Sequence, residues 1–119
     1  MKDNTMNDLN RVLYERRDHV GVITLNRPEV LNAFDRDMYD GVNRALQLFR
    51  DDSTAYVGVL QAAGDRAFSA GADVKAIAAD LKAGTFEGYG PLISDDDMVT
   101  AKPLIAAVHG HCIGEGVNL

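Results

Sequence analysis

Apolar and polar positions alternate near the start of the chain and predict two strands, Val12–Arg17 and Val20–Leu25. β-Branched residues dominate the second strand, and the join Asp18-His19 is short enough for a hairpin. Pro28 removes a backbone donor and restricts the residue before it, so the second strand ends there. The chain therefore opens with an expected pair of antiparallel strands.

Farther along, the alternation gives way to a helical period over residues 35–51. One apolar stripe is expected on this helix, formed by Met38, Val42, Ala45 or Leu46, and Phe49. Residues 56–62 are mostly apolar, which is typical of a strand buried on both faces. A shorter helix is predicted over residues 73–83, with an apolar face of Val74, Ile77, Ala78 and Leu81. Residues 104–108 predict another buried strand, and the order of elements predicts an α/β fold.

A stretch of small residues, 67–75, connects the strand at 56–62 to the helix after it. Gly71 relaxes the backbone in this stretch, and Asp73 is a good helix N-cap. Backbone N–H groups at such a positive helix end can hold an oxyanion or a phosphate. Taken alone, this stretch is better explained as an ordinary strand-to-helix connection.

A second glycine turn, Gly114-Glu115-Gly116, follows the strand expected at residues 104–108. If the two preceding strands are neighbours in one sheet, both turns emerge at the same edge, where α/β folds form their binding crevices. Two N–H groups that converge there would make an oxyanion hole. The sequence predicts this convergence only on that condition.

Composition narrows the class of protein. The 119 residues allow one domain, and 46% hydrophobic and 25% charged residues are ordinary for a globular chain. A net charge of −6 argues against nucleic-acid binding. No apolar run approaches the roughly 20 residues of a membrane helix, and residues 1–10 lack the apolar core of a signal peptide. We expect a disordered lead-in over residues 1–10, a domain over residues 11–119, and a cytoplasmic location.

Three further features raise the question of metal or thiol chemistry. Asp95 to Asp97 follow Ser94 and predict the cap of a short helix that ends before Pro103, because three consecutive helical carboxylates point in different directions. His109 and His111 flank Gly110 without a carboxylate at the spacing of a zinc motif, so we interpret them as structural. The single cysteine, Cys112, lies in an apolar stretch and is expected to be buried. No metal site is predicted.

Three blocks of sequence carry a family resemblance. Residues 22–34 contain Val-Ile-Thr-Leu-Asn-Arg-Pro-Glu and Leu-Asn-Ala-Phe, residues 67–75 read Ala-Phe-Ser-Ala-Gly-Ala-Asp-Val-Lys, and residues 102–110 read Lys-Pro-Leu-Ile-Ala-Ala-Val-His-Gly. In order and spacing they resemble the crotonase, or enoyl-CoA hydratase/isomerase, superfamily. The chain stops within an apolar element, so we expect it to be the N-terminal piece of a longer protein, roughly the first half of the family's domain.

The resemblance implies a spiral of ββα turns that is usually assembled as trimers or as hexamers made of two trimers. It also implies an acyl-CoA thioester substrate, with coenzyme A entering as part of that substrate and no separate cofactor. In the family, two backbone N–H groups hold the thioester oxygen as an enolate forms, and by position these belong to Ala72 and Glu115. The same resemblance places a set of residues against the substrate or its CoA portion: Arg27, Asn32, Ala33, Ala70, Gly71, Ala72, Asp73, Val74, Lys75, Gly114 and Glu115.

Two departures from the family pattern affect the expected chemistry. Asn118 stands where hydratases of the family carry the first of two catalytic glutamates, and an amide cannot act as a general base. Glu115 replaces the usual glycine; its side chain either points away from the oxyanion or is itself the acid/base.

We therefore expect an acyl-CoA hydratase or isomerase, a hydrolase or isomerase that lacks the first glutamate, or a catalytically silent CoA-binding or assembly subunit. The 119 residues alone are expected to be inactive.

Overall fold

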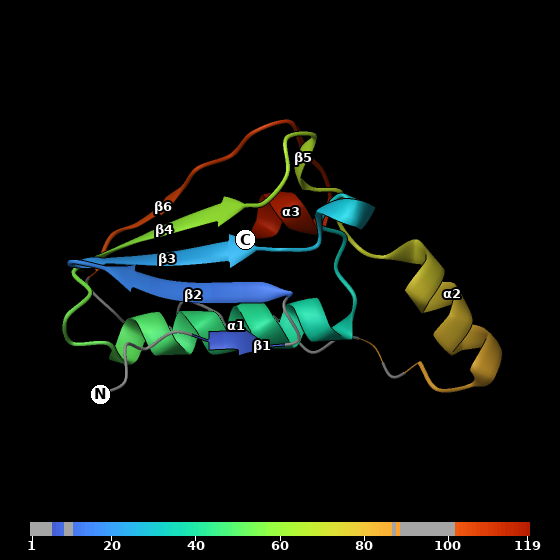
Figure 1. The fold of residues 1–119 in the computed structure, drawn as a ribbon. Coiled ribbons are helices and arrows are strands. Elements are labelled where there is room, and N and C mark those ends of the chain that lie inside the picture. Colours follow the sequence, from blue (N-terminus) through green and yellow to red (C-terminus); the bar gives the residue numbers. More distant parts are fainter. Residues whose placement is uncertain (1–5, 9–10, 87, 89–101) are drawn as a thin grey trace.

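The computed structural model describes residues 6–8, 11–86, 88 and 102–119. Along the chain, the described elements are β1 (Met6–Asp8), β2 (Val12–Arg17), β3 (Val20–Leu25), the 3₁₀ helix η1 (Pro28–Val30), α1 (Arg36–Asp51), β4 (Val57–Ala62), β5 (Ala67–Ser69), α2 (Val74–Ala83), β6 (Leu104–Ala106), β7 (His111–Cys112) and α3 (Glu115–Asn118). Figure 1 shows α1 packed along the sheet and α3 near the ends of β3 and β4. None of the described helices is long and apolar enough to span a bilayer.

The larger sheet has the strand order β1-β2-β3-β4-β6. β2 and β3 are antiparallel, and Arg17 pairs with Val20 across the predicted two-residue hairpin. β4 then pairs with β3 in parallel, with α1 as the connection, and β6 pairs with β4 in parallel. β4 and β6 are therefore neighbours, and the condition set for the two glycine turns is met.

Helix α1 begins as the sequence predicts, because the side chain of Asp35 accepts a hydrogen bond from the Met38 N–H at 3.0 Å. Its apolar stripe packs against β2 and β3 and forms the core together with residues of both strands. The predicted stripe is confirmed, with Ala45 fully buried and Leu46 only partly so. Burial of this stripe holds the helix on the sheet.

Two facing glycines explain how Phe49 of α1 fits beneath the sheet. Gly21 of β3 pairs with Gly58 of β4. A Cβ atom added to either glycine would lie 2.8 Å from the Phe49 ring. The missing side chains therefore leave the space that this buried ring fills.

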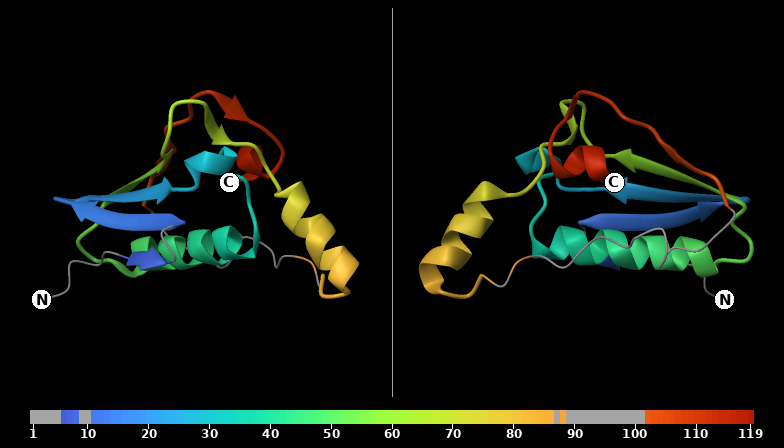
Figure 2. Two further views of the ribbon diagram at one scale, coloured as in Figure 1. Left: turned by 45° about the vertical axis from the view of Figure 1, so that its right-hand side comes forward. Right: turned by 180° about the vertical axis from the view of Figure 1, so that it is seen from behind.

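The exposure of the later elements differs from the prediction. β4 buries Gly58 and Leu60 on one face and leaves Val57 and Val59 half-buried, so the expected burial on both faces is wrong. β6 is exposed along its length, with Ile105 at 56%, since among the described residues only β4 pairs with it. No residue of α2 is buried, because this helix projects away from the body (Figure 2).

Three smaller expectations concern short segments of the chain. Within the expected lead-in over residues 1–10, Met6–Asp8 form a strand paired with β2. Cys112 is half-buried and packs against the edge of the core, since it lies in the short strand β7. The helix expected from Ser94 lies outside the described residues.

Candidate active site

The two predicted glycine turns meet beyond the carboxyl ends of β4 and β6. A Cβ atom added to Gly71 would lie 2.9 Å from the carbonyl oxygen of Ile113 and 3.5 Å from the amide nitrogen of Glu115. Both turn glycines have positive φ angles, 91° for Gly71 and 58° for Gly114, a region that other residues enter at a cost. Strands β5 and β7 pair in parallel just before these turns and bring them together.

The direction of the Ala72 amide follows from its neighbours. Ala72 forms an isolated parallel bridge with Phe34, in which the Phe34 N–H donates to the Gly71 carbonyl at 2.7 Å and the Asp73 N–H donates to the Phe34 carbonyl at 2.8 Å. In a trans peptide the N–H points opposite to the carbonyl of the same plane. The Ala72 N–H therefore points away from Phe34.

This amide also differs from the other amides of its turn. The N–H groups of Ala70 and Gly71 donate to Leu31 O and Ser69 Oγ at 2.9 and 3.1 Å. The Ala72 N–H has no acceptor among the residues that the structure describes, and the residue is exposed. A single donor is thus left available to a ligand in a turn whose other N–H groups are satisfied.

The second turn leads into α3, whose first residue is Glu115. The next two amides turn back into this loop, from Gly116 to Ile113 O and from Val117 to Gly114 O, both at 3.0 Å. Glu115 is half-buried, and its amide lies at the N-terminal end of α3. Asn118 is the last residue of this helix, and its side chain is outside the described part of the structure.

Ser69, the last residue of β5, connects the two turns and is fully buried. Its hydroxyl accepts from the Gly71 N–H at 3.1 Å and donates to the Asn32 carbonyl at 2.8 Å, while its own carbonyl accepts from the Ile113 N–H at 3.0 Å. Ser69 was not predicted to be a functional residue. Its place two residues before Gly71, in a run of small residues, was the available signal.

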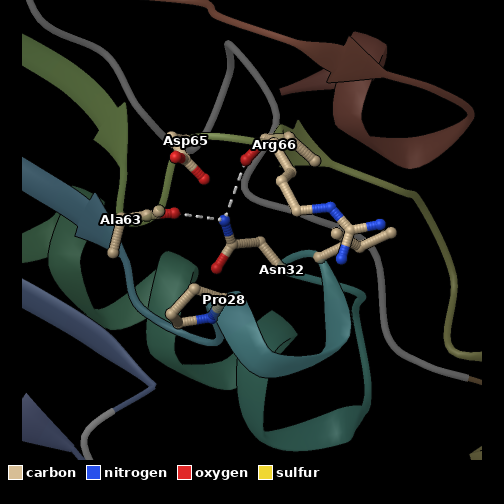
Figure 3. Close-up of a pocket in the computed structure, with 8 residues that line it drawn as sticks. Pro28, Asn32, Ala63, Asp65 and Arg66 are labelled. Carbon is tan, nitrogen blue, oxygen red and sulfur yellow. Dashed lines mark hydrogen bonds between the residues drawn. The ribbon is translucent and has the colours of Figure 1, made fainter.

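Asn32 was expected to lie against the nucleotide portion of the substrate, but its side chain is fully buried. Its oxygen accepts from the Arg27 N–H at 2.7 Å. Its amide donates to Ala63 O and Ala67 O at 3.0 and 3.1 Å, the bonds drawn as dashed lines in Figure 3. The adjoining pocket measures about 70 Å³, below the ~300 Å³ of common ligand sites. The Asn32 side chain therefore supports the turn.

Arg27 and Asp73 also face each other rather than open solvent. Their side chains are 15% and 13% exposed, and the guanidinium lies 2.9 Å from the Asp73 carboxylate. Burial raises the pKa of Asp73, but hydrogen bonds from Ala76 N–H and Arg27, together with the Arg27 charge, outweigh it and hold the pKa below its usual value. Asp73 also caps α2, since its carboxylate accepts from the Ala76 N–H at 3.0 Å.

The remaining predicted binding residues differ in accessibility. Val74 and Lys75, at the start of α2, are exposed, and Val74 reaches 74%. Ala70 is half-buried, while Ala33 is buried and its carbonyl accepts from Arg27 at 3.0 Å. Within the described ranges, no group of three or more His, Cys, Asp and Glu residues could hold a metal ion.

The fold described above is similar to that of solved structures of known proteins. A solved carnitinyl-CoA dehydratase from Mycobacterium avium 104 superposes with a TM-score of 0.73 at 39% identity, over 92% of this chain and 43% of that one. An enoyl-CoA hydratase from Mycobacterium tuberculosis H37Rv gives a TM-score of 0.71 at 31% identity, over 90% and 41%. The architecture is thus the mixed α/β fold of the crotonases.

The sequence comparisons agree with the structural ones. The model of the family described as enoyl-CoA hydratase/isomerase matches residues 15–119. The mitochondrial 3-hydroxyisobutyryl-CoA hydrolase of Danio rerio is 36% identical over 115 residues, and the short-chain-enoyl-CoA hydratase of Clostridium acetobutylicum is 32% identical over 117. This chain belongs to the enoyl-CoA hydratase/isomerase family.

These matches cover very different shares of this chain and of its two curated relatives. They cover 91% and 94% of this chain but only 30% and 44% of the two curated relatives. The chain therefore spans less than half the length of either relative.

Proposed function

We propose that this chain forms the carbonyl-binding part of a site that stabilises the enolate of an acyl-CoA thioester. The donors are the backbone N–H groups of Ala72 and Glu115. The observation that supports the proposal is the contact between the Gly71 and Gly114 turns, where a Cβ atom added to Gly71 would lie 3.5 Å from the Glu115 nitrogen. Donors fixed before the reaction stabilise developing negative charge without reorganisation.

Such a site would polarise the thioester carbonyl. Polarisation lowers the barrier to removing a proton from the α-carbon and activates a conjugated β-carbon toward water. Either reaction needs a group that moves protons. Glu115 is the carboxylate that the second turn itself supplies, and the family resemblance implies a further catalytic carboxylate that follows it in the sequence.

The reaction is proposed to be hydration, isomerisation or hydrolysis of an acyl-CoA, since relatives named for hydration, dehydration and hydrolysis are all similar to this chain. Coenzyme A would enter as part of the substrate. A homo-trimer or homo-hexamer and a cytoplasmic location are part of the same proposal.

A catalytically silent CoA-binding subunit is the second candidate, and Asn118 favours it. An amide at this position cannot take a proton from water. The complete gene product should therefore be assayed for hydration of crotonyl-CoA, isomerisation of a 3-enoyl-CoA and hydrolysis of 3-hydroxyisobutyryl-CoA. Binding of these thioesters without turnover of any would select the silent subunit.

The substitution Gly71→Ala tests the oxyanion site directly. The new Cβ would lie between the two turns, 2.9 Å from Ile113 O, and must push them apart. We expect turnover to fall by about 10²-fold, the effect of losing one oxyanion donor. A folded Gly71→Ala variant with wild-type turnover would contradict the proposal.

Gly84→Ala is the matched control. Gly84 also has a positive φ, 73°, but a Cβ atom there would meet nothing within 4 Å. Both variants should lose about 1–2 kcal/mol of stability to the left-handed backbone. Only Gly71→Ala should lose activity, and thermal melts of both proteins would establish that each remains folded.

A further inference from the structure

Arg27 was expected to contact the nucleotide portion of the substrate, but both its side chain and its backbone are bonded to other residues of this chain. One guanidinium nitrogen donates to the Ala33 carbonyl at 3.0 Å and to the Asp73 carboxylate at 2.9 Å, and a second lies 3.5 Å from the Asp35 carboxylate. The backbone of Arg27 is also engaged, since its N–H donates to Asn32 Oδ1 at 2.7 Å and its carbonyl accepts from the Asn32 N–H at 2.8 Å. Arg27 is thus fixed at both ends.

Arg27 joins the two segments that meet at the parallel bridge between Phe34 and Ala72. Its two partners are the sequence neighbours of the bridged residues, since Ala33 precedes Phe34 and Asp73 follows Ala72. The bridge itself has two hydrogen bonds, from Phe34 N–H to Gly71 O and from Asp73 N–H to Phe34 O. Arg27 adds a charged link between the same two segments, from the side chain of Asp73 to the carbonyl of Ala33.

A planar guanidinium suits this place, because it can reach a carbonyl and a carboxylate in fixed directions. Bonds to an ionised carboxylate are also stronger than neutral ones. The result is that the segment carrying the Ala72 N–H cannot turn without breaking a part-buried ion pair.

We propose that Arg27 is a positioning residue for the Ala72 amide, acting through Asp73 and the Ala33 carbonyl, and not a ligand of coenzyme A. This inference rests on the proposed function, because it concerns the donor that the oxyanion site uses. Arg27 does not touch the reacting atoms.

The two possible roles of Arg27 predict different binding behaviour. A CoA ligand would contribute equally to every CoA derivative. A positioning residue would matter only to compounds with a carbonyl oxygen at the thioester. Hexanoyl-CoA and its thioether analogue hexyl-CoA form the matched probes, since hexyl-CoA lacks that oxygen.

The experiment measures both dissociation constants by calorimetry in the complete gene product and in Arg27→Met. The wild type should bind hexanoyl-CoA about ten-fold more tightly than hexyl-CoA, the value of one or two good hydrogen bonds. Arg27→Met should lose most of that preference while its affinity for hexyl-CoA changes less than two-fold. Arg27→Lys should keep part of the preference, because a lysine retains the charge but not the fork.

Two further variants keep the test independent of folding. Asp73→Asn keeps a good N-cap for α2 but removes the charge that Arg27 meets, so the preference should fall less than in Arg27→Met. Arg11→Met is the control: Arg11 pairs with Asp35 at 2.7 Å and with Asp37 at 3.6 Å in the same group of charges, and within the described part of the structure its side chain is linked to neither Ala33 nor Asp73. Its preference should equal that of the wild type.

The outcomes separate the two proposals. Equal affinities of the wild-type protein for both probes would overturn the proposed oxyanion site. A wild-type preference that survives in Arg27→Met and Asp73→Asn would overturn the positioning role alone. An equal loss of affinity for both probes in Arg27→Met would make Arg27 a CoA ligand and contradict the inference.

Discussion

The two glycine turns of the candidate site are supported in different ways. Around the Gly71 turn, buried or part-buried polar side chains supply the support: Ser69, Asn32, Arg27 and Asp73. Among the described residues, the Gly114 turn is held mainly by backbone hydrogen bonds and by contact with the first turn. Its neighbours Ile113 and Val117 are exposed, the latter at 65%.

This difference shows where the geometry of the site originates. The first turn is held by the η1 loop, through the Leu31 carbonyl and the Asn32 side chain, and by the ion pair of Arg27 with Asp73. The second turn takes its position from the first, through the β5–β7 pair and through Ser69. Changes to the scaffold of the first turn should therefore damage stability more than changes to the surface of the second.

The largest effect is expected from Asn32→Ala. The variant loses three hydrogen bonds of a buried amide and places alanine at a φ of 54°. We expect a loss of about 3 kcal/mol in the free energy of unfolding, measured by urea titration. Asn32→Gly removes the same side chain without the backbone strain and should be milder. A loss below about 1 kcal/mol in both variants would contradict the comparison.

A smaller effect is expected where the second turn rests on the first. In Gly116→Ala, the new Cβ would lie 2.9 Å from Ser69 Cβ and 3.0 Å from Ser69 O, so the two turns must separate. We expect a cost of about 2 kcal/mol from overpacking. The neighbouring exposed change Val117→Ser should stay within about 0.5 kcal/mol. Equal effects of the two changes in urea titrations would show that the turns are not in contact.

The smallest effect concerns pH. Asp73 has a folded-state pKa below the ordinary value of an aspartate, so it binds its proton less readily in the folded chain than in the unfolded one. Its contribution to stability is present above that value and is lost as the pH falls through the folded pKa. Unfolding measured between pH 7 and pH 2 should show a steeper acid loss in the wild type than in Asp73→Asn. Parallel curves would remove Asp73 as a contributor.

The elements that were predicted correctly are those whose signals lie close together in the sequence. The β2–β3 hairpin, α1 with its Asp35 cap and α2 with its Asp73 cap are confirmed, because alternation, period and capping residues all lie within a few positions of each other. The pairing of β4 with β6 was only an assumption, on which the predicted convergence of the two turns depended, because it joins residues more than 40 positions apart.

The remaining features depend on distant partners. β5 has three residues and no measurable period, and its partner β7 lies far along the chain. The ion pair of Arg27 with Asp73 spans 46 positions, so no local pattern predicted it, and the family resemblance alone led to the expected contact of Arg27 with coenzyme A. The exposure of β6 and α2 was also missed, because an apolar run predicts burial without naming what covers it.

The parallel pairing of β3 with β4 also sets the order in which the sheet can form. β2 and β3 are connected by a two-residue turn and can pair locally. β4 pairs with β3 only after the chain has passed through η1 and α1. Closing that longer loop costs entropy before the strand contacts repay it. We therefore expect the hairpin and α1 to form before the centre of the sheet, and the site to assemble last, on elements that are already packed.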